Sequence, residues 1–171
     1  MTKCVILTLK IPLWSVLKMI KILFVCLGNI CRSPMAEFVM KDLVKKAGLS
    51  KQFLIESAGT SRAGGAVYPP AQRKLAEHGI SCKGKTSRQL LKEDYAVYDL
   101  LIGMDYGNLR SMRRICGDDP EGKMHLLLDF TDCPRDIADP WYTDDFDTAW
   151  KDVEKGCLGL LKHLETRKSR C

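Results

Sequence analysis

The sequence lacks the spacings by which cysteine and histidine usually bind zinc. It has eight cysteines and three histidines, but no Cys-x2-Cys pair and no two histidines only three to five residues apart. The cysteines are also too few and too irregular for the disulfide framework of a secreted domain. We therefore expect a reduced, cytoplasmic protein that holds no metal and no cofactor.

The sequence also lacks a long apolar run and a strong charge of one sign. No stretch of about 20 apolar residues is present, which is the length that a membrane-spanning helix needs. The net charge of +6 is spread along the chain, so no basic patch indicates nucleic-acid binding. We expect no nucleic-acid partner, no stable membrane association, and a monomer or weak dimer.

The length of 171 residues fits a single domain. A regular pattern of apolar runs begins at about residue 19, so residues 19–171 are expected to form that domain. Within residues 1–18, Lys10 and Pro12 interrupt an apolar stretch, and this makes the segment a poor secretory signal. They are interpreted as an N-terminal extension, either a product of start-site choice or a loosely attached arm.

Short apolar runs at residues 20–25, 53–55, 100–104 and 124–128 predict four strands. Between and after them, helical spacing predicts helices at 33–47, 71–78, 108–115 and 146–164. This alternation predicts an α/β fold, a four-stranded parallel sheet with helices on both faces, in a single domain. Ligands of such folds bind beyond the carboxyl ends of the strands.

A candidate phosphate-binding loop follows the first strand, where residues 26–34 read Cys-Leu-Gly-Asn-Ile-Cys-Arg-Ser-Pro. Its backbone N–H groups and the helix that follows would attract an anion and favour the thiolate of Cys26, the form that acts as nucleophile. The planar guanidinium of Arg32 matches two phosphoryl oxygens. Gly28 and Asn29 tolerate the positive φ of a tight loop, and Ser33 is expected to cap the helix.

A phosphatase also needs a group that protonates the leaving oxygen. Asp139 is the candidate, because Pro140 disfavours a helical conformation at the preceding residue and stiffens the turn. It follows the fourth strand, so it is expected to lie at the same sheet edge as Cys26.

Taken together, these motifs resemble the low-molecular-weight protein tyrosine phosphatases. The resemblance covers roughly residues 20 to 165. It rests on Cys26 to Glu37, Ser57-Ala-Gly-Thr-Ser61, His78-Gly-Ile80, Arg88-Gln89, Lys92-Glu-Asp94, Met104-Asp105, Asn108-Leu-Arg110 and Asp139-Pro140.

The resemblance implies a protein tyrosine phosphatase that hydrolyses phosphotyrosine, in a protein or as an aryl phosphate, through a phosphocysteine. Cys26 would be the nucleophile, Arg32 the phosphoryl clamp and Asp139 the general acid and base. The implied binding loop and its support comprise Leu27, Gly28, Asn29, Ile30, Cys31, Ser33, Ser57 and His78. The implied substrate rim comprises Trp141, Tyr142 and Tyr68, and Cys31 is a candidate partner for a reversible disulfide with Cys26.

Three alternatives share this loop. An arsenate reductase needs further thiols, but Cys82 has no cysteine partner before Cys116. Protein arginine phosphatases carry threonine where this chain has Ile30, whose methyl groups suit an aromatic ring. A non-catalytic phosphocarrier or phosphoprotein-binding module would not need the acid that Asp139 provides.

Overall fold

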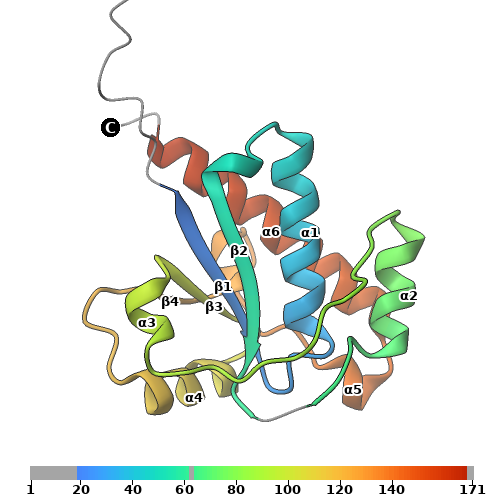
Figure 1. Ribbon diagram of the computed structural model, residues 1–171, viewed down its shortest axis with the longest axis horizontal. Helices are drawn as coiled ribbons and strands as arrows, with labels where there is room; N and C mark the ends of the chain where they lie inside the picture. The colour runs from blue at the N-terminus through green and yellow to red at the C-terminus, as the bar shows by residue number, and fades with distance from the viewer. Residues whose placement is uncertain (1–18, 62–63, 169–171) are drawn as a thin grey trace, which may run out of the picture.

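The computed structural model describes residues 19–61 and 64–168, and the expected extension at residues 1–18 lies outside these ranges (Figure 1). Four strands form one sheet in the order β2-β1-β3-β4. All neighbouring strands are parallel, which confirms the predicted architecture. The strands are β1 (Ile20–Cys26), β2 (Phe53–Gly59), β3 (Leu100–Gly103) and β4 (Met124–Leu126).

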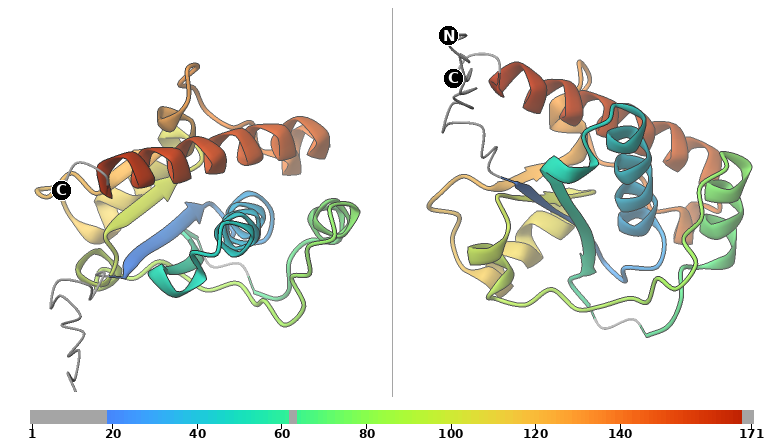
Figure 2. Two further views of the ribbon diagram at one scale, coloured as in Figure 1. Left: turned by 90° about the horizontal axis from the view of Figure 1, so that it is seen from above. Right: turned by 45° about the horizontal axis from the view of Figure 1, so that its top comes forward.

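Helices cover both faces of the sheet (Figure 2). Helices α1 and α6 pack together on one face, with α2 beside them, and α4 packs on the other face against β3 and β4. The helices are α1 (Arg32–Lys46), α2 (Pro69–Glu77), α3 (Asp94–Val97), α4 (Tyr106–Cys116), α5 (Pro140–Thr143) and α6 (Phe146–Lys168), with 3-10 turns η1 (Ser50–Gln52) and η2 (Leu127–Phe130).

The central strand β1 explains why the chain forms two cores. Ile22 and Phe24 are fully buried in the core beneath α1 and α6, whereas Leu23 and Val25 are fully buried in the core beneath α4. Successive side chains of a strand point to opposite faces. The part of β1 that is covered on both sides, residues 22–26, is therefore apolar throughout, as is typical of parallel sheets.

Local details differ from the sequence-based predictions. Ser33 lies inside α1 and is not its cap, because the helix already begins at Arg32 and Cys31 is the N-cap residue. Leu128 belongs to the 3-10 turn η2, which ends the fourth strand early. The short helices α3 and α5 were not predicted, since four residues carry too little periodicity to reveal a helix.

The fold brings the ends of several elements to one edge of the sheet. The β1–α1 loop, the start of α4 and the short helix α5 all lie at the carboxyl end of the strands (Figure 1). Across the described ranges, no helix has the length and apolar character to cross a membrane.

Candidate active site

The loop between β1 and α1 wraps around the sulfur of Cys26, which ends the strand. Asn29 adopts a left-handed conformation with φ of 56°, one that asparagine tolerates better than most residues. This turn brings the Asn29 backbone N–H to 3.3 Å from the Cys26 sulfur, and Ser33 Oγ lies 3.0 Å from the same atom. Both contacts suit a sulfur that carries negative charge.

Arg32 is fully buried behind the loop and is oriented by three acceptors. Its Nη1 donates to Asp105 at 2.6 Å and to the carbonyl of Ile137 at 2.8 Å, and its Nη2 donates to Asp139 at 2.5 Å. Burial acts to lower the pKa of Arg32, but the negative charge of Asp139, with smaller contributions from other neighbours, outweighs it and raises the pKa. The guanidinium is therefore a fixed positive charge at the pocket wall.

One donor of this guanidinium remains available. Within residues 19–61 and 64–168, the buried Nε of Arg32 has no hydrogen-bond partner. A buried donor without an acceptor is costly. An anion bound in the loop would supply the missing acceptor.

Asp139 is held by its own backbone and by Arg32. It has an extended conformation, with φ of −80° and ψ of 112°, and caps α5 by accepting a hydrogen bond from the backbone N–H of Trp141 at 3.1 Å. The extended conformation predicted from Pro140 is thus present. The same carboxyl group reaches Arg32 through its second oxygen.

These groups line a small pocket of about 130 Å³. The pocket brings together most of the residues that the sequence predicted: Cys26, Leu27, Gly28, Ile30, Cys31, Arg32, Asp139, Trp141 and Tyr142. A nucleophilic sulfur, a fixed positive charge and a carboxyl group therefore face the same space.

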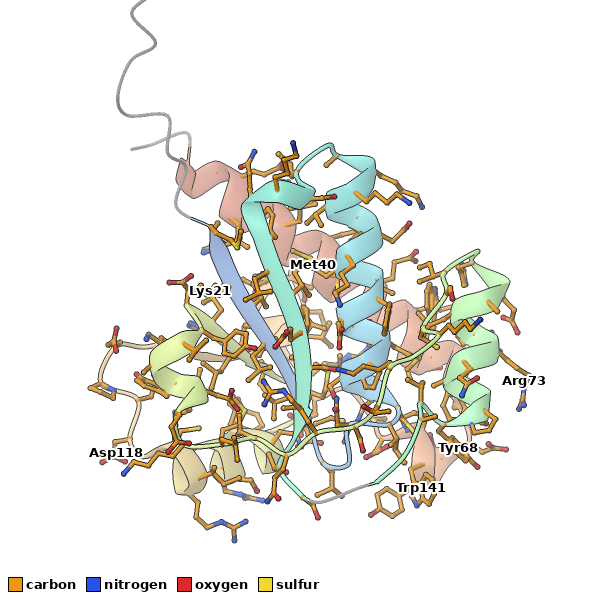
Figure 3. The ribbon with its side chains drawn as sticks, in the orientation of Figure 1. Lys21, Met40, Tyr68, Arg73, Asp118 and Trp141 are labelled. Atoms are coloured by element: carbon orange, nitrogen blue, oxygen red, sulfur yellow. The ribbon has the colours of Figure 1, made fainter. Side chains whose placement is uncertain are left out.

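Aromatic side chains form the mouth of the pocket. Trp141 and Tyr142 are 55% and 76% exposed, and the ring of Tyr68 lies 5.0 Å from that of Trp141 (Figure 3). The backbone N–H of Tyr68 donates to the carbonyl of Ile30 at 2.8 Å. The loop that carries Tyr68 is thereby attached to the loop between β1 and α1.

Below the pocket, buried polar groups hold the loop in shape. Asn29 donates to Ser57 Oγ at 2.8 Å and to Ser33 Oγ at 3.0 Å. Its side-chain oxygen accepts the backbone N–H of Arg88 at 2.9 Å. The predicted support residues Asn29, Ser33 and Ser57 thus share one network, which compensates for their burial.

The network continues to a buried ion cluster that sequence reasoning missed. Glu37 accepts a hydrogen bond from Ser57 at 2.5 Å and pairs with Lys85 at 2.7 Å and Lys41 at 2.5 Å. Burial acts to raise the pKa of Glu37, but hydrogen bonds from Lys41 and Lys85 outweigh it and lower the pKa. The sequence feature that could have indicated this cluster is a glutamate among apolar neighbours on a predicted helix.

The chain is also similar in sequence to a known protein family. Residues 21–170 match the family described as "Low molecular weight phosphotyrosine protein phosphatase". The chain belongs to this family.

Relatives and a solved structure agree with that assignment. The low molecular weight protein-tyrosine-phosphatase YfkJ of Bacillus subtilis is 37% identical, covering 88% of this chain and 99% of its own length. The low molecular weight phosphotyrosine protein phosphatase 1 of Drosophila melanogaster is 36% identical, over 83% of this chain and 95% of its own. The crystal structure of YfkJ is similar with a TM-score of 0.85, covering 88% of this chain and 98% of that one.

One predicted support residue of this family member lies elsewhere. His78 ends α2 and stacks on Trp150, with ring centroids 4.0 Å apart and planes 12° apart. It is exposed, and among the residues that the structure describes it forms no hydrogen bond with the network around Asn29. The predicted placement of His78 is corrected accordingly, and Lys85 occupies the basic position beside Ser57.

Cys31 lies in the same pocket as Cys26, but its environment differs. It is 5% exposed, and burial, together with the negative charge of Cys26, raises the pKa of its thiol to about 12. Cys31 is thus held as a thiol and is a poor nucleophile. Among the described residues, no group of three or more histidine, cysteine or acidic side chains is arranged to hold a metal ion.

Proposed function

We propose that this protein hydrolyses phosphotyrosine through a phosphocysteine intermediate. The observation that carries the proposal is the arrangement of the Cys26 sulfur, the Arg32 guanidinium and the Asp139 carboxyl around one pocket with an aromatic mouth. Neither a binding module nor a phosphocarrier needs a carboxyl group positioned to protonate a leaving oxygen.

In the first step the thiolate of Cys26 attacks phosphorus while the bond to the phenolic oxygen breaks. The loop N–H groups and Arg32 bind the three non-bridging oxygens, which carry the developing charge. Those oxygens compete with Asp139 for the guanidinium, so the carboxyl is released toward the leaving oxygen. Once released, the Asp139 carboxylate takes up a proton from solvent and donates it to the leaving phenolic oxygen.

In the second step a water molecule attacks phosphorus and the sulfur–phosphorus bond breaks. Asp139, now a carboxylate, takes a proton from that water, and inorganic phosphate is formed. Ser33 Oγ lies 3.0 Å from the sulfur, where its hydroxyl can donate to the departing thiolate. Asp139 gives this proton back to solvent as it pairs again with Arg32, so the enzyme returns to its starting state, and no oxidant or reductant is needed.

Phosphotyrosine is favoured over other phosphoesters by the lining of the pocket. Ile30 and Leu27 present methyl groups along the wall, and Trp141 offers an aromatic face at the mouth. Aromatic pairs of this kind stabilise a bound ring. The apolar wall at Ile30 also favours a phenyl ring over the polar guanidino group of phosphoarginine.

An arsenate reductase is less consistent with the positions of the thiols. Within the described part of the chain, Cys31 is the one further cysteine that lines the pocket. Cys82 lines a separate depression beside α2, and Cys116 lies in the core on the opposite face of the sheet. A relay of disulfides from Cys26 through Cys82 or Cys116 would require large movements.

The proposal is tested by hydrolysis of para-nitrophenyl phosphate in the presence of EDTA. Wild-type protein is expected to be active, and Cys26→Ser to be inactive, because a serine hydroxyl is a far weaker nucleophile than a thiolate. Cys133→Ser, which changes an exposed cysteine outside the pocket, serves as the matched control and should keep full activity. Strict metal dependence, or full activity of Cys26→Ser, would contradict the mechanism.

A further inference from the structure

A second depression of about 600 Å³ lies directly beside the catalytic pocket. The two share Leu27, Arg32, Asp139 and Tyr142 in their linings. Residues next to a phosphotyrosine bound in the pocket are therefore within reach of this second depression, which we call the α4 groove.

The α4 groove carries two arginines without counter-charges. Arg110 and Arg114 line it from α4, one helical turn apart, and both are exposed. Neither forms an ion pair or hydrogen bond with any residue in the described ranges. In contrast, Arg88 is paired with Asp94 and Arg135 with Asp152.

Within the part of the chain that the structure describes, the acidic groups of the groove form no ion pair with Arg110 or Arg114. Asp105 and Asp139 are its acidic lining residues, and both are engaged by Arg32. The groove therefore presents two free guanidinium groups to whatever lies in it. Guanidinium groups bind carboxylates through paired hydrogen bonds.

We propose that the α4 groove selects phosphotyrosine peptides that carry acidic side chains beside the phosphotyrosine. This inference rests on the proposed phosphatase activity and names the substrates that the same site prefers. Arg110 and Arg114 are four residues apart in α4 and so about 6 Å apart along the helix axis, and alternate residues of an extended peptide are about 7 Å apart. Two acidic residues separated by one residue therefore match the two arginines.

The test compares kcat/KM for matched phosphotyrosine peptides. In each test peptide a pair of glutamates lies on one side of the phosphotyrosine, N-terminal or C-terminal to it. The two glutamates are the first and third, or the second and fourth, residues counted from the phosphotyrosine. Each reference peptide has glutamine at the same two positions. Wild-type protein is expected to prefer a glutamate peptide about fivefold, the size expected of two solvent-exposed ion pairs. The preference should shrink in about 0.5 M salt, which screens such pairs.

The double variant Arg110→Ala with Arg114→Ala should lower the ratio of the two kcat/KM values to about one. Using a ratio cancels any loss of folded protein. Arg113→Ala is the matched control, because Arg113 is an exposed arginine of the same helix that does not line the groove. This variant should retain the wild-type ratio.

Each other outcome has a distinct meaning. Equal rates on both peptide sets in the wild type, or a preference that survives in the double variant, would overturn the role of the groove and leave the phosphatase activity intact. Absence of hydrolysis of every phosphotyrosine peptide and of para-nitrophenyl phosphate would instead overturn the proposed function itself.

Discussion

The floor and the mouth of the catalytic pocket are built in opposite ways. The floor is polar and buried, with Asn29, Ser33, Ser57 and Glu37 each at most 3% exposed and hydrogen-bonded to one another. The mouth is aromatic and exposed, with Trp141 and Tyr142 largely in solvent. The polar residues are thus inside, and large apolar residues are outside.

The buried polar floor and the exposed aromatic mouth are suited to two different tasks. A buried network of hydrogen bonds is rigid and holds the loop around the Cys26 sulfur. An exposed aromatic surface offers stacking to many substrates and changes at little cost to the fold. We infer that the floor determines whether catalysis occurs, and that the mouth determines which substrate is used.

Asp139 connects the two regions, and changing it should have the largest effect. Asp139→Asn keeps the cap of α5, because asparagine is an equally good N-cap residue, but removes the proton donor. Turnover of aryl phosphates with poor leaving groups should fall about 10³-fold, the range of general acid catalysis. Turnover of those with good leaving groups should fall much less, as measured by steady-state kinetics over a leaving-group series.

The matched control is Asp145→Asn, which alters an exposed carboxyl that caps α6 at Thr148. It should leave turnover of every aryl phosphate unchanged. Equal losses for good and poor leaving groups in Asp139→Asn would show that the carboxyl only positions Arg32.

The floor is expected to depend on Glu37. Glu37→Gln leaves Lys85, which is mostly buried, without its counter-charge, and breaking a buried ion pair costs about 3 kcal/mol of unfolding free energy. The free energy of unfolding, measured in urea at pH 7, should fall by about that amount. Asp42→Asn, in the same helix, breaks a more exposed pair with Lys46 and should cost less than about 1 kcal/mol.

The difference in unfolding free energy between wild type and Glu37→Gln should depend on pH, because the pKa of Glu37 is lowered in the folded protein. A carboxyl whose pKa is lower in the folded than in the unfolded protein stabilises the fold above its ordinary pKa of 4.5 and loses that contribution as pH falls through the folded value. The gap between wild type and Glu37→Gln should therefore be full at pH 7 and narrow below about pH 4.5. A gap that is constant from pH 7 to pH 3 would contradict the ionised state of Glu37.

Much of the sheet, the loop after β1 and the position of Asp139 was predictable from the sequence, because local signals specify them, whereas the aromatic mouth was implied by the family resemblance. The apolar run of β1 and the Cys-x5-Arg spacing that follows lie within a few residues of each other, and Pro140 marks the conformation of Asp139 directly. The parallel order of strands then brings Asp139 to the edge where Cys26 lies.

The floor was less predictable, because its contacts join residues far apart in the sequence. Lys85 meets Glu37 across nearly fifty residues, and neither residue has a local pattern that names the other. His78 has the chemistry of a support residue but ends α2, where stacking on Trp150 takes it away from the loop. Spatial partners of buried polar groups are set by packing, which sequence periodicity does not encode.

The wall of the pocket below the mouth is expected to determine selectivity as the mouth does, and Ile30 offers the mildest test. Ile30→Thr replaces the ethyl branch of the Ile30 side chain by a hydroxyl, which shortens the apolar wall of the pocket and favours a polar guanidino substrate. The ratio of kcat/KM for phosphotyrosine over phosphoarginine should fall about tenfold. Val97→Thr makes a similar change at an exposed position of α3 and should leave the ratio as it is.

If Ile30→Thr instead abolished both activities equally, the wall at Ile30 would belong functionally to the floor, and the division between the two regions would fail at this residue.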